Sequence, residues 1–183
     1  RENHSGTAVN VDAASELTEI NNDGVISAAG AGLGAQVSAI KVETGTFTTL
    51  NNTGTISGAF AAGSELEDGV TAGYARAVDF SALTQDITFI QTKRTPVEDR
   101  NGDGDIDGDD VAEPVIRGDV VFGSGNDVFQ LLEGSLTGNV FFGAGTADFD
   151  IRNAFVSGTT WFQGGSGSLL IDNSTYNGNL QFG

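Results

Sequence analysis

The segment between residues 99 and 110 carries the side chains best suited to chemistry, because carboxylates and a carboxamide alternate along it. The candidate ligands are Asp99, Asn101, Asp103, Asp105, Asp107 and Asp110. They stand at positions 1, 3, 5, 7, 9 and 12 of a loop that has Gly104 at position 6 and Ile106 at position 8. In a tight loop with this spacing, alternate residues turn their oxygens toward one hard cation. The sequence therefore predicts one bound Ca²⁺ (Ca2+), which Asp105 would contact through its backbone carbonyl.

The loop resembles the calcium-binding loops of EF-hand and dockerin proteins. It departs from the EF-hand at position 12, where Asp110 replaces glutamate and leaves bidentate ligation by this residue open. Pro96 and Pro114 also leave no room for two full flanking helices. We therefore expect a lone calcium loop within an acidic insertion over residues 96–114. The alternative is a solvated acidic loop, but carboxylates this close repel one another unless a cation neutralises them.

A second set of side chains suits the cleavage of polysaccharides. Asp148 and Asp150 are two residues apart in a predicted strand, so their carboxylates would point to the same face. Arg152 is the nearest cation in the sequence, as a lyase would need beside such a pair. We favour the simpler interpretation, in which these are surface carboxylates on an outward strand face, and we assign no catalytic residue. Trp161 and Tyr176 could stack on a sugar, but both occupy strand positions of a repeat.

The composition excludes several classes of function. Lys and Arg number 8 and Asp and Glu number 25, which gives a formal net charge of −17. Nucleic acid and anionic membrane surfaces are therefore not expected as partners, because both need clustered cations. The chain has no cysteine and a single histidine, His4, so disulfides, thiolate metal sites and nearly all histidine chemistry are excluded.

A repeat of 20 residues in the C-terminal third predicts the fold that positions these side chains. The recurring glycines are Gly118, Gly138, Gly158 and Gly178, and the recurring phenylalanines are Phe122, Phe142, Phe162 and Phe182. Apolar residues alternate between them, as at Phe149 and Ile151, which is the period of a strand. One unit cannot bury its apolar face alone, so the units must stack. We predict an all-β, right-handed, single-stranded parallel β-helix with a phenylalanine ladder inside it.

The N-terminal half follows the same design with looser spacing. Residues Ile20–Ser27 recur as Leu50–Ser57, an offset of 30. Each copy contains an Asn-Asn-x-Gly sequence, which is typical of a turn between strands. The residues in excess of 20 lie in the glycine- and alanine-rich stretches Ala28–Ala35 and Gly58–Gly63, which we expect to be loops. Residues Ile87–Gln91 are predicted to form one more strand.

These residues are similar to the passenger repeats of bacterial autotransporters, most clearly in Gly118–Asp127 and Thr137–Thr146. The resemblance extends to the Asn-Asn-x-Gly elements and covers residues 8–92 and 115–183. It implies a type V secreted protein, extracellular on the bacterial cell surface. The parent chain would be anchored by an outer-membrane β-barrel that residues 1–183 do not include. We expect residues 1–183 to be a single β-helical fragment of that larger parent.

The resemblance implies a structural or adhesive function rather than an enzymatic one. We expect a rigid β-helical rod with a calcium-stabilised loop that mediates surface attachment or cell–cell contact. Its ligand on a host or bacterial surface is unknown, and a glycan and self-association between passengers both stay open. The alternative function is a polysaccharide lyase or glycoside hydrolase of the β-helix type.

Overall fold

The computed structural model describes residues 4–62, 71–164 and 166–183. The described residues form an all-β structure in which a single helical turn, η1 (Gly108–Asp110), interrupts the strands. Within these ranges no helix has the length and apolar character needed to cross a membrane.

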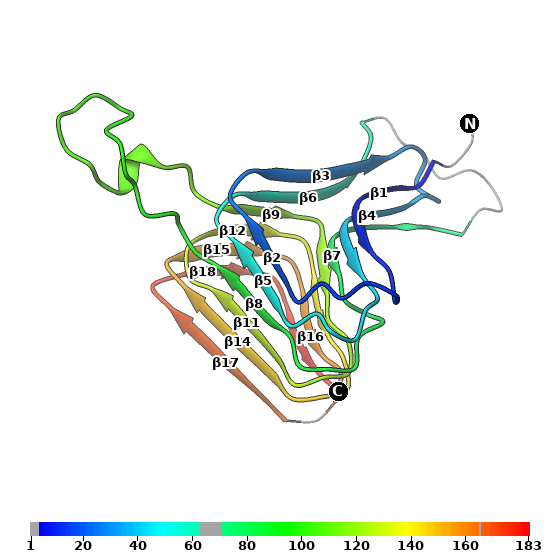
Figure 1. The fold of residues 1–183 in the computed structure, drawn as a ribbon. Helices are drawn as coiled ribbons and strands as arrows, with labels where there is room; N and C mark the ends of the chain where they lie inside the picture. Colours follow the sequence, from blue (N-terminus) through cyan, green and yellow to red (C-terminus); the bar gives the residue numbers. More distant parts are fainter. Residues whose placement is uncertain (1–3, 63–70, 165) are drawn as a thin grey trace.

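The strands form three parallel sheets that run alongside one another (Figure 1). The seven-stranded sheet has the order β1 (Gly6–Val11), β4 (Gln36–Val42), β7 (Tyr74–Asp79), β10 (Asp119–Val121), β13 (Val140–Phe142), β16 (Thr160–Phe162) and β19 (Leu180–Phe182). The β2–β17 sheet contains β2 (Glu19–Asn22), β5 (Thr49–Asn52), β8 (Thr88–Gln91), β11 (Asp127–Leu131), β14 (Ala147–Arg152) and β17 (Gly167–Asp172). The β3–β18 sheet contains β3 (Val25–Gly30), β6 (Thr55–Phe60), β9 (Val115–Arg117), β12 (Gly134–Thr137), β15 (Ala154–Ser157) and β18 (Thr175–Asn177).

Neighbouring strands within each sheet are three strands apart in chain order, so the chain passes through all three sheets before it returns to the first. Every pairing between the named strands is parallel, which requires such a crossover connection. An isolated antiparallel bridge joins His4 and Ala31 outside these strands. The predicted all-β class and parallel pairing are therefore confirmed, and the arrangement is consistent with a parallel β-helix, or solenoid. We refer to the stacked strands as the coil.

The predicted phenylalanine ladder forms. Its first three residues, Phe122, Phe142 and Phe162, are buried inside the coil, whereas Phe182 is 71% exposed. Phe142 stacks on Phe122 and Phe162, with ring centroids 4.9 and 5.2 Å apart, and Phe162 stacks on Phe182 at 5.1 Å. Phe142 is buried, with 1% of its surface exposed. Stacked rings at this distance add attraction to the burial of apolar area.

A second aromatic ladder joins the irregular half of the chain to the repeating half. Phe129 stacks on Phe89 at 4.7 Å and on Phe149 at 4.9 Å. The register pairs these residues directly across β8, β11 and β14. The apolar core is therefore continuous past the point where the acidic insertion leaves the coil.

A ladder of buried amides accompanies the aromatic ones in the N-terminal half. Asn22 donates from Nδ2 to Oδ1 of Asn52 at 2.8 Å, and Asn52 donates from Nδ2 to Oε1 of Gln91 at 2.7 Å. Gln91 in turn donates from Nε2 to the carbonyl of Glu133 at 3.2 Å. The sequence predicted only turns at these asparagines. The structure shows that they also link successive turns, which satisfies polar groups that burial would otherwise penalise.

The expected loops begin later than the sequence indicated. Residues Ala28–Gly30 and Gly58–Phe60 continue β3 and β6 as paired strands, so the expected loops Ala28–Ala35 and Gly58–Gly63 are wrong over these positions. Small residues are needed here because the seven-stranded sheet approaches closely. A Cβ added at Gly58 would overlap the backbone carbonyl of Arg76. Gly63 lies outside the described residues.

Candidate functional site

The acidic insertion projects from the coil between β8 and β9 (Figure 1). Its two ends are joined by an ion pair between Nζ of Lys93 and Oε1 of Glu113 at 2.5 Å. The Glu113 hydrogen bond, followed by its charge, raises the pKa of Lys93. The carboxylate of Glu133 on the next turn accepts from the backbone N–H of Lys93 at 2.5 Å. The coil therefore fixes the base of the insertion, and the loop itself extends beyond it.

The first part of the loop is coiled around the Asp99 carboxylate. Its Oδ1 accepts from the backbone N–H of Gly102 at 2.6 Å, and its Oδ2 accepts from that of Gly104 at 3.0 Å. Gly104 has a φ of +99°, in the left-handed region that favours glycine. The glycine that the sequence placed at position 6 thus lies at a turn that requires it.

The following Asn and Asp side chains continue this pattern, each accepting from the backbone N–H group two residues later. Asn101 Oδ1 accepts from the N–H of Asp103 at 2.9 Å, and Asp103 Oδ1 accepts from that of Asp105 at 3.0 Å. Asp107 Oδ1 accepts from the N–H of Asp109 at 2.9 Å and begins the helical turn η1. These are side-chain turns of the kind that Asp and Asn favour. They keep the loop compact while the side chains of residues 99–109 remain exposed.

Asp110 closes the loop. Its Oδ1 accepts from the backbone N–H groups of Arg100 at 2.6 Å and Asn101 at 3.1 Å, and its Oδ2 accepts from that of Asp107 at 3.0 Å. Only 4% of Asp110 is exposed. The backbone hydrogen bonds from Asp107, Asn101 and Arg100 hold the pKa of this carboxyl below its usual range. Sequence reasoning named Asp110 as a ligand and missed this second role, which ties the start of the loop to its end.

The loop carries the donor types, in the order, that the predicted calcium site needs. Three of the predicted ligands, Asp99, Asp103 and Asp107, are exposed carboxylates. Asn101 adds a carboxamide, Asp105 adds its backbone carbonyl, and Asp110 retains a free lone pair on Oδ2. In the described ranges, no three carboxylate or imidazole side chains converge as a preformed metal site. The ligand assignment from Asp99 to Asp110 therefore stays a prediction.

The carboxylates that suggested polysaccharide cleavage lie on the outward face of β14. Asp148, Asp150 and Arg152 alternate there with the buried residues of the strand. Nε of Arg152 contacts both carboxylate oxygens of Asp150, at 2.8 and 3.0 Å. Asp148 Oδ1 instead accepts from Oγ of Ser168 on the next strand at 2.5 Å. The structure thus places both carboxylates on one face, as predicted, and pairs each with a different neighbour.

A buried carboxyl group whose burial was not predicted lies at the start of β11. Asp127 is only 2% exposed, and its Oδ1 accepts from the N–H of Ile87 at 3.0 Å. Burial, with a further contribution from the charge of Asp86, raises the pKa of Asp127 to about 6. The register places Ala147 and Gly167 in the same slot on the next two turns. A charged residue in a slot that the other repeats fill with small residues was the available signal.

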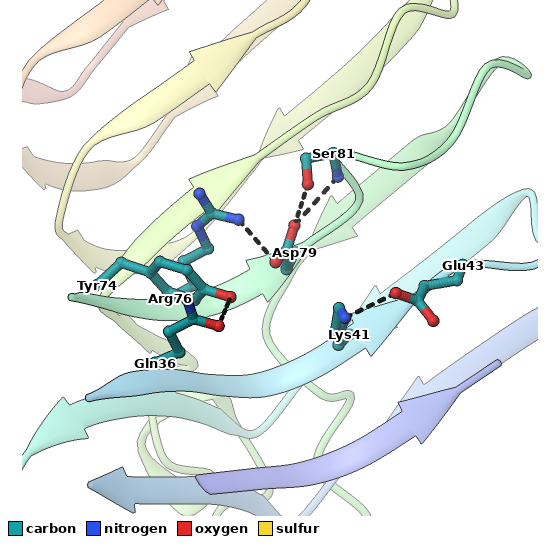
Figure 2. A network of polar contacts seen from close by, with 7 residues as sticks. All are labelled: Gln36, Lys41, Glu43, Tyr74, Arg76, Asp79 and Ser81. Atoms are coloured by element: carbon teal, nitrogen blue, oxygen red, sulfur yellow. Dashed lines mark hydrogen bonds and ion pairs between the residues drawn. The ribbon is translucent and has the colours of Figure 1, made fainter. Parts of the chain in front are cut away.

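A polar network lies on the outer face of β7 (Figure 2). Nη1 of Arg76 contacts Oδ2 of Asp79 at 2.7 Å, and Asp79 Oδ1 accepts from Oγ of Ser81 at 2.6 Å. The Arg76 guanidinium also lies 3.9 Å from the ring centroid of Tyr74. Because Asp79 is 3% exposed and fully paired, it neutralises Arg76 and fixes the plane of its guanidinium.

Comparison with known proteins finds no matching family model, curated protein or solved structure. Function must therefore be inferred from the residues and contacts described above. The fold alone does not decide it, since one architecture carries many unrelated activities.

Proposed function

We propose that this chain is a structural and adhesive segment of a bacterial cell-surface passenger of the autotransporter type. It forms a rigid, right-handed, single-stranded β-helical rod, with about 20 residues per turn in its C-terminal part. The observation that carries the proposal is the constant register of the strands from β9 onward. There, residues 20 apart pair in all three sheets, as Phe142 does with Phe162, Phe149 with Leu169 and Val156 with Tyr176. Such a coil extends by about 4.8 Å with every turn and suits a spacer that presents its surface at a distance from the cell.

The projecting loop supplies the second part of the proposal, a calcium site. Asp99, Asn101 and Asp103 provide side-chain oxygens, and Asp105 provides its carbonyl. Asp107 and Asp110 complete the set. A bound Ca²⁺ neutralises carboxylates that otherwise repel one another, so it holds the loop closed at the surface of the coil. Loops of this kind in extracellular modules bind at about 10⁻⁴–10⁻³ M, which matches the calcium concentration outside cells.

Calorimetric titration of the chelator-treated chain tests the calcium site. We expect one ion per chain, and a marked loss of binding for Asp99→Ala and Asp103→Ala. Glu98→Ala is the matched control, because Glu98 is an exposed acidic neighbour outside the ligand positions. Mg²⁺ should bind poorly, since it demands tighter octahedral geometry. The absence of heat at several millimolar calcium, or equal binding by both ligand variants and the parent, would overturn the assignment.

The adhesive part is tested separately, by attachment of beads coated with the chain. Coated beads should attach to host or bacterial cells, or to each other, more strongly than beads coated with an unrelated acidic protein of similar charge. Attachment no stronger than that of the control beads would contradict the adhesive function and leave only a spacer.

A further inference from the structure

A groove of about 550 Å³ opens on the outer face of the seven-stranded sheet. It extends across β7, β10 and β13 to the residue that follows β16, and its volume lies in the range of small-ligand sites. Its lining mixes aromatic, charged and neutral polar side chains. The members that matter here are Tyr74, Arg76, Asp119, Ser124, Phe141 and Gln163.

Phe141 contributes an aromatic ring to the wall of the groove. Phe141 lies in an outward row between Val121 on β10 and Trp161 on β16. Trp161 stacks on it with ring centroids 4.5 Å apart and an angle of 2° between the planes. Trp161 therefore covers one face of Phe141, and the other face is turned toward the smaller Val121, which lines the groove. Because valine is shorter than phenylalanine, the outer part of this face extends beyond Val121 and offers an apolar surface to a ligand.

The opposite side of the groove offers fixed polar groups. Asp79 and the Tyr74 ring hold the Arg76 guanidinium in place, as Figure 2 shows. On the adjacent strand, Asp119 uses Oδ1 to accept from both the N–H and Nδ2 of Asn139, at 2.8 and 3.0 Å. Its Oδ2 accepts no hydrogen bond within the described part of the chain. The groove thus contains a free acceptor oxygen, Oδ2 of Asp119, and a donor, the guanidinium of Arg76, whose charge is compensated by Asp79.

We propose that this groove binds a neutral oligosaccharide, an inference that rests on the proposed adhesive function and names its partner class. A hexopyranose ring has an apolar C–H face and a rim of hydroxyl groups. The C–H face would stack on Phe141, and hydroxyl groups would donate to Asp119 and accept from Arg76 or Gln163. The mixture of one apolar surface and several fixed polar groups matches both parts of the ring.

Charge selects against acidic sugars. The chain carries a formal net charge of −17, and Asp119 adds a carboxylate inside the groove itself. The one guanidinium in the lining, that of Arg76, is already paired with Asp79. A uronate or sialate would therefore meet net repulsion, whereas hydroxyl groups would not.

The backbone around the groove selects against an extended peptide. A peptide that adds to a sheet needs a free strand edge. Here β10 pairs with β7 on one side and with β13 on the other, so its backbone hydrogen bonds are made within the sheet. A ligand that stacks on side chains and bonds with their polar groups suits this face better.

The test is calorimetric titration of the whole chain with neutral and acidic probes. Cellotetraose, maltotetraose and N-acetyllactosamine are the neutral probes, and tetragalacturonate is the acidic one. We expect one neutral probe to bind, at one site per chain, at least about tenfold more tightly than tetragalacturonate. Phe141→Val should weaken binding about tenfold or more by removing the stacking face, and Val121→Trp should abolish it by filling the groove.

Phe155→Val is the matched control, because Phe155 is 42% exposed on β15 of a different sheet and should not affect binding. Thermal unfolding verifies that each variant is folded, and Asp119→Asn, which keeps the size of the side chain, provides a second probe of the groove. The inference is overturned if no neutral probe binds the parent, if the acidic probe binds best, or if Phe141→Val and Val121→Trp bind like the parent. Preferential capture of an unstructured peptide library would overturn it as well.

The bead assay keeps this inference distinguishable from the proposed adhesive function. If the parent binds a neutral probe but coated beads attach to nothing, sugar binding by the groove is supported and the adhesive function is contradicted. If beads coated with Phe141→Val still attach as the parent does, adhesion stands and the groove is not its site.

Discussion

The aromatic ladder and the projecting loop hold successive chain segments together by opposite chemistry. In the ladder, Phe142 is 1% exposed and stacks between two other rings at 4.9 and 5.2 Å. In the loop, every residue from 99 to 109 is exposed, and carboxylates accept hydrogen bonds from backbone N–H groups instead. The ladder is stabilised by the chain's own apolar surface, whereas the loop concentrates negative charge. The coil should therefore be stable without ions, whereas the order of the loop should depend on them.

The largest expected effect comes from breaking the ladder. Phe142→Ala should lower the free energy of unfolding by about 3–5 kcal/mol, because it removes a fully buried ring and leaves a cavity. Chemical denaturation measures the change. Phe155→Ala, at an exposed position on β15, is the control and should cost much less. A loss below about 1 kcal/mol at Phe142 would contradict the account of the core.

The next largest effect is the pH dependence of stability caused by the buried carboxyl of Asp127. A paired surface carboxylate stabilises the fold when it is ionised, whereas Asp127 stabilises it when it is protonated. Its pKa is raised to about 6 in the folded chain, above the unfolded value near 3.9, so the folded state binds the proton more tightly. The free energy of unfolding should therefore fall as pH rises from about 4 to about 6, by as much as about 3 kcal/mol, and stay lower above that range.

Asp127→Asn isolates this contribution. The variant keeps an acceptor for the N–H of Ile87 but cannot ionise. It should be more stable than the parent at pH 7.5 and lose the fall in stability between pH 4 and 6, while Asp148→Asn, at an exposed position, should retain it. If the free energy of unfolding varied with pH in the same way in the parent and in Asp127→Asn, this carboxyl would not be the cause of the fall between pH 4 and 6.

Calcium should stabilise the folded chain by a smaller amount. At ten to twenty times the dissociation constant, mass action adds about 1.5–2 kcal/mol. A thermal melt with and without calcium measures the shift, and Asp103→Ala should abolish it. A shift that survives in Asp103→Ala would show that the ion acts elsewhere, which would weaken the contrast between coil and loop.

The smallest expected effect concerns the carboxylates of β14. Asp150 is held by Arg152 through two contacts, so we expect no cleavage of pectin or alginate by the parent chain. Product analysis after long incubation tests this. Unsaturated products that disappear in Asp148→Asn or Asp150→Asn would favour the alternative function, a lyase or hydrolase.

The repeating half of the core could be predicted from the sequence because the same residue types recur every 20 positions. Phe142 and Phe162 fall on one register row for this reason. The ladder also continues from Phe122 to Phe80 and Phe47, with ring centroids 6.0 and 5.4 Å apart. That continuation was not predicted, since loops of unequal length separate these residues and hide the period.

The candidate sites, too, could be predicted only in part from the sequence. The spacing from Asp99 to Asp110 could be recognised, since the ligands of a calcium loop are close together in sequence. The closing role of Asp110 and the burial of Asp127 could not, because both depend on which backbone N–H groups come near after folding. The groove beside Phe141 depends on an outward row of three separate strands, which is set by register rather than by local sequence.

Hydrogen exchange of backbone amides, with and without calcium, tests the contrast between coil and loop most directly. Amides within residues 99–110 should gain protection when calcium is added. Amides of the ladder strands β11, β13 and β14 should be strongly protected in both conditions. Protection that appears throughout the coil only with calcium, or a loop that is equally protected without it, would contradict the account.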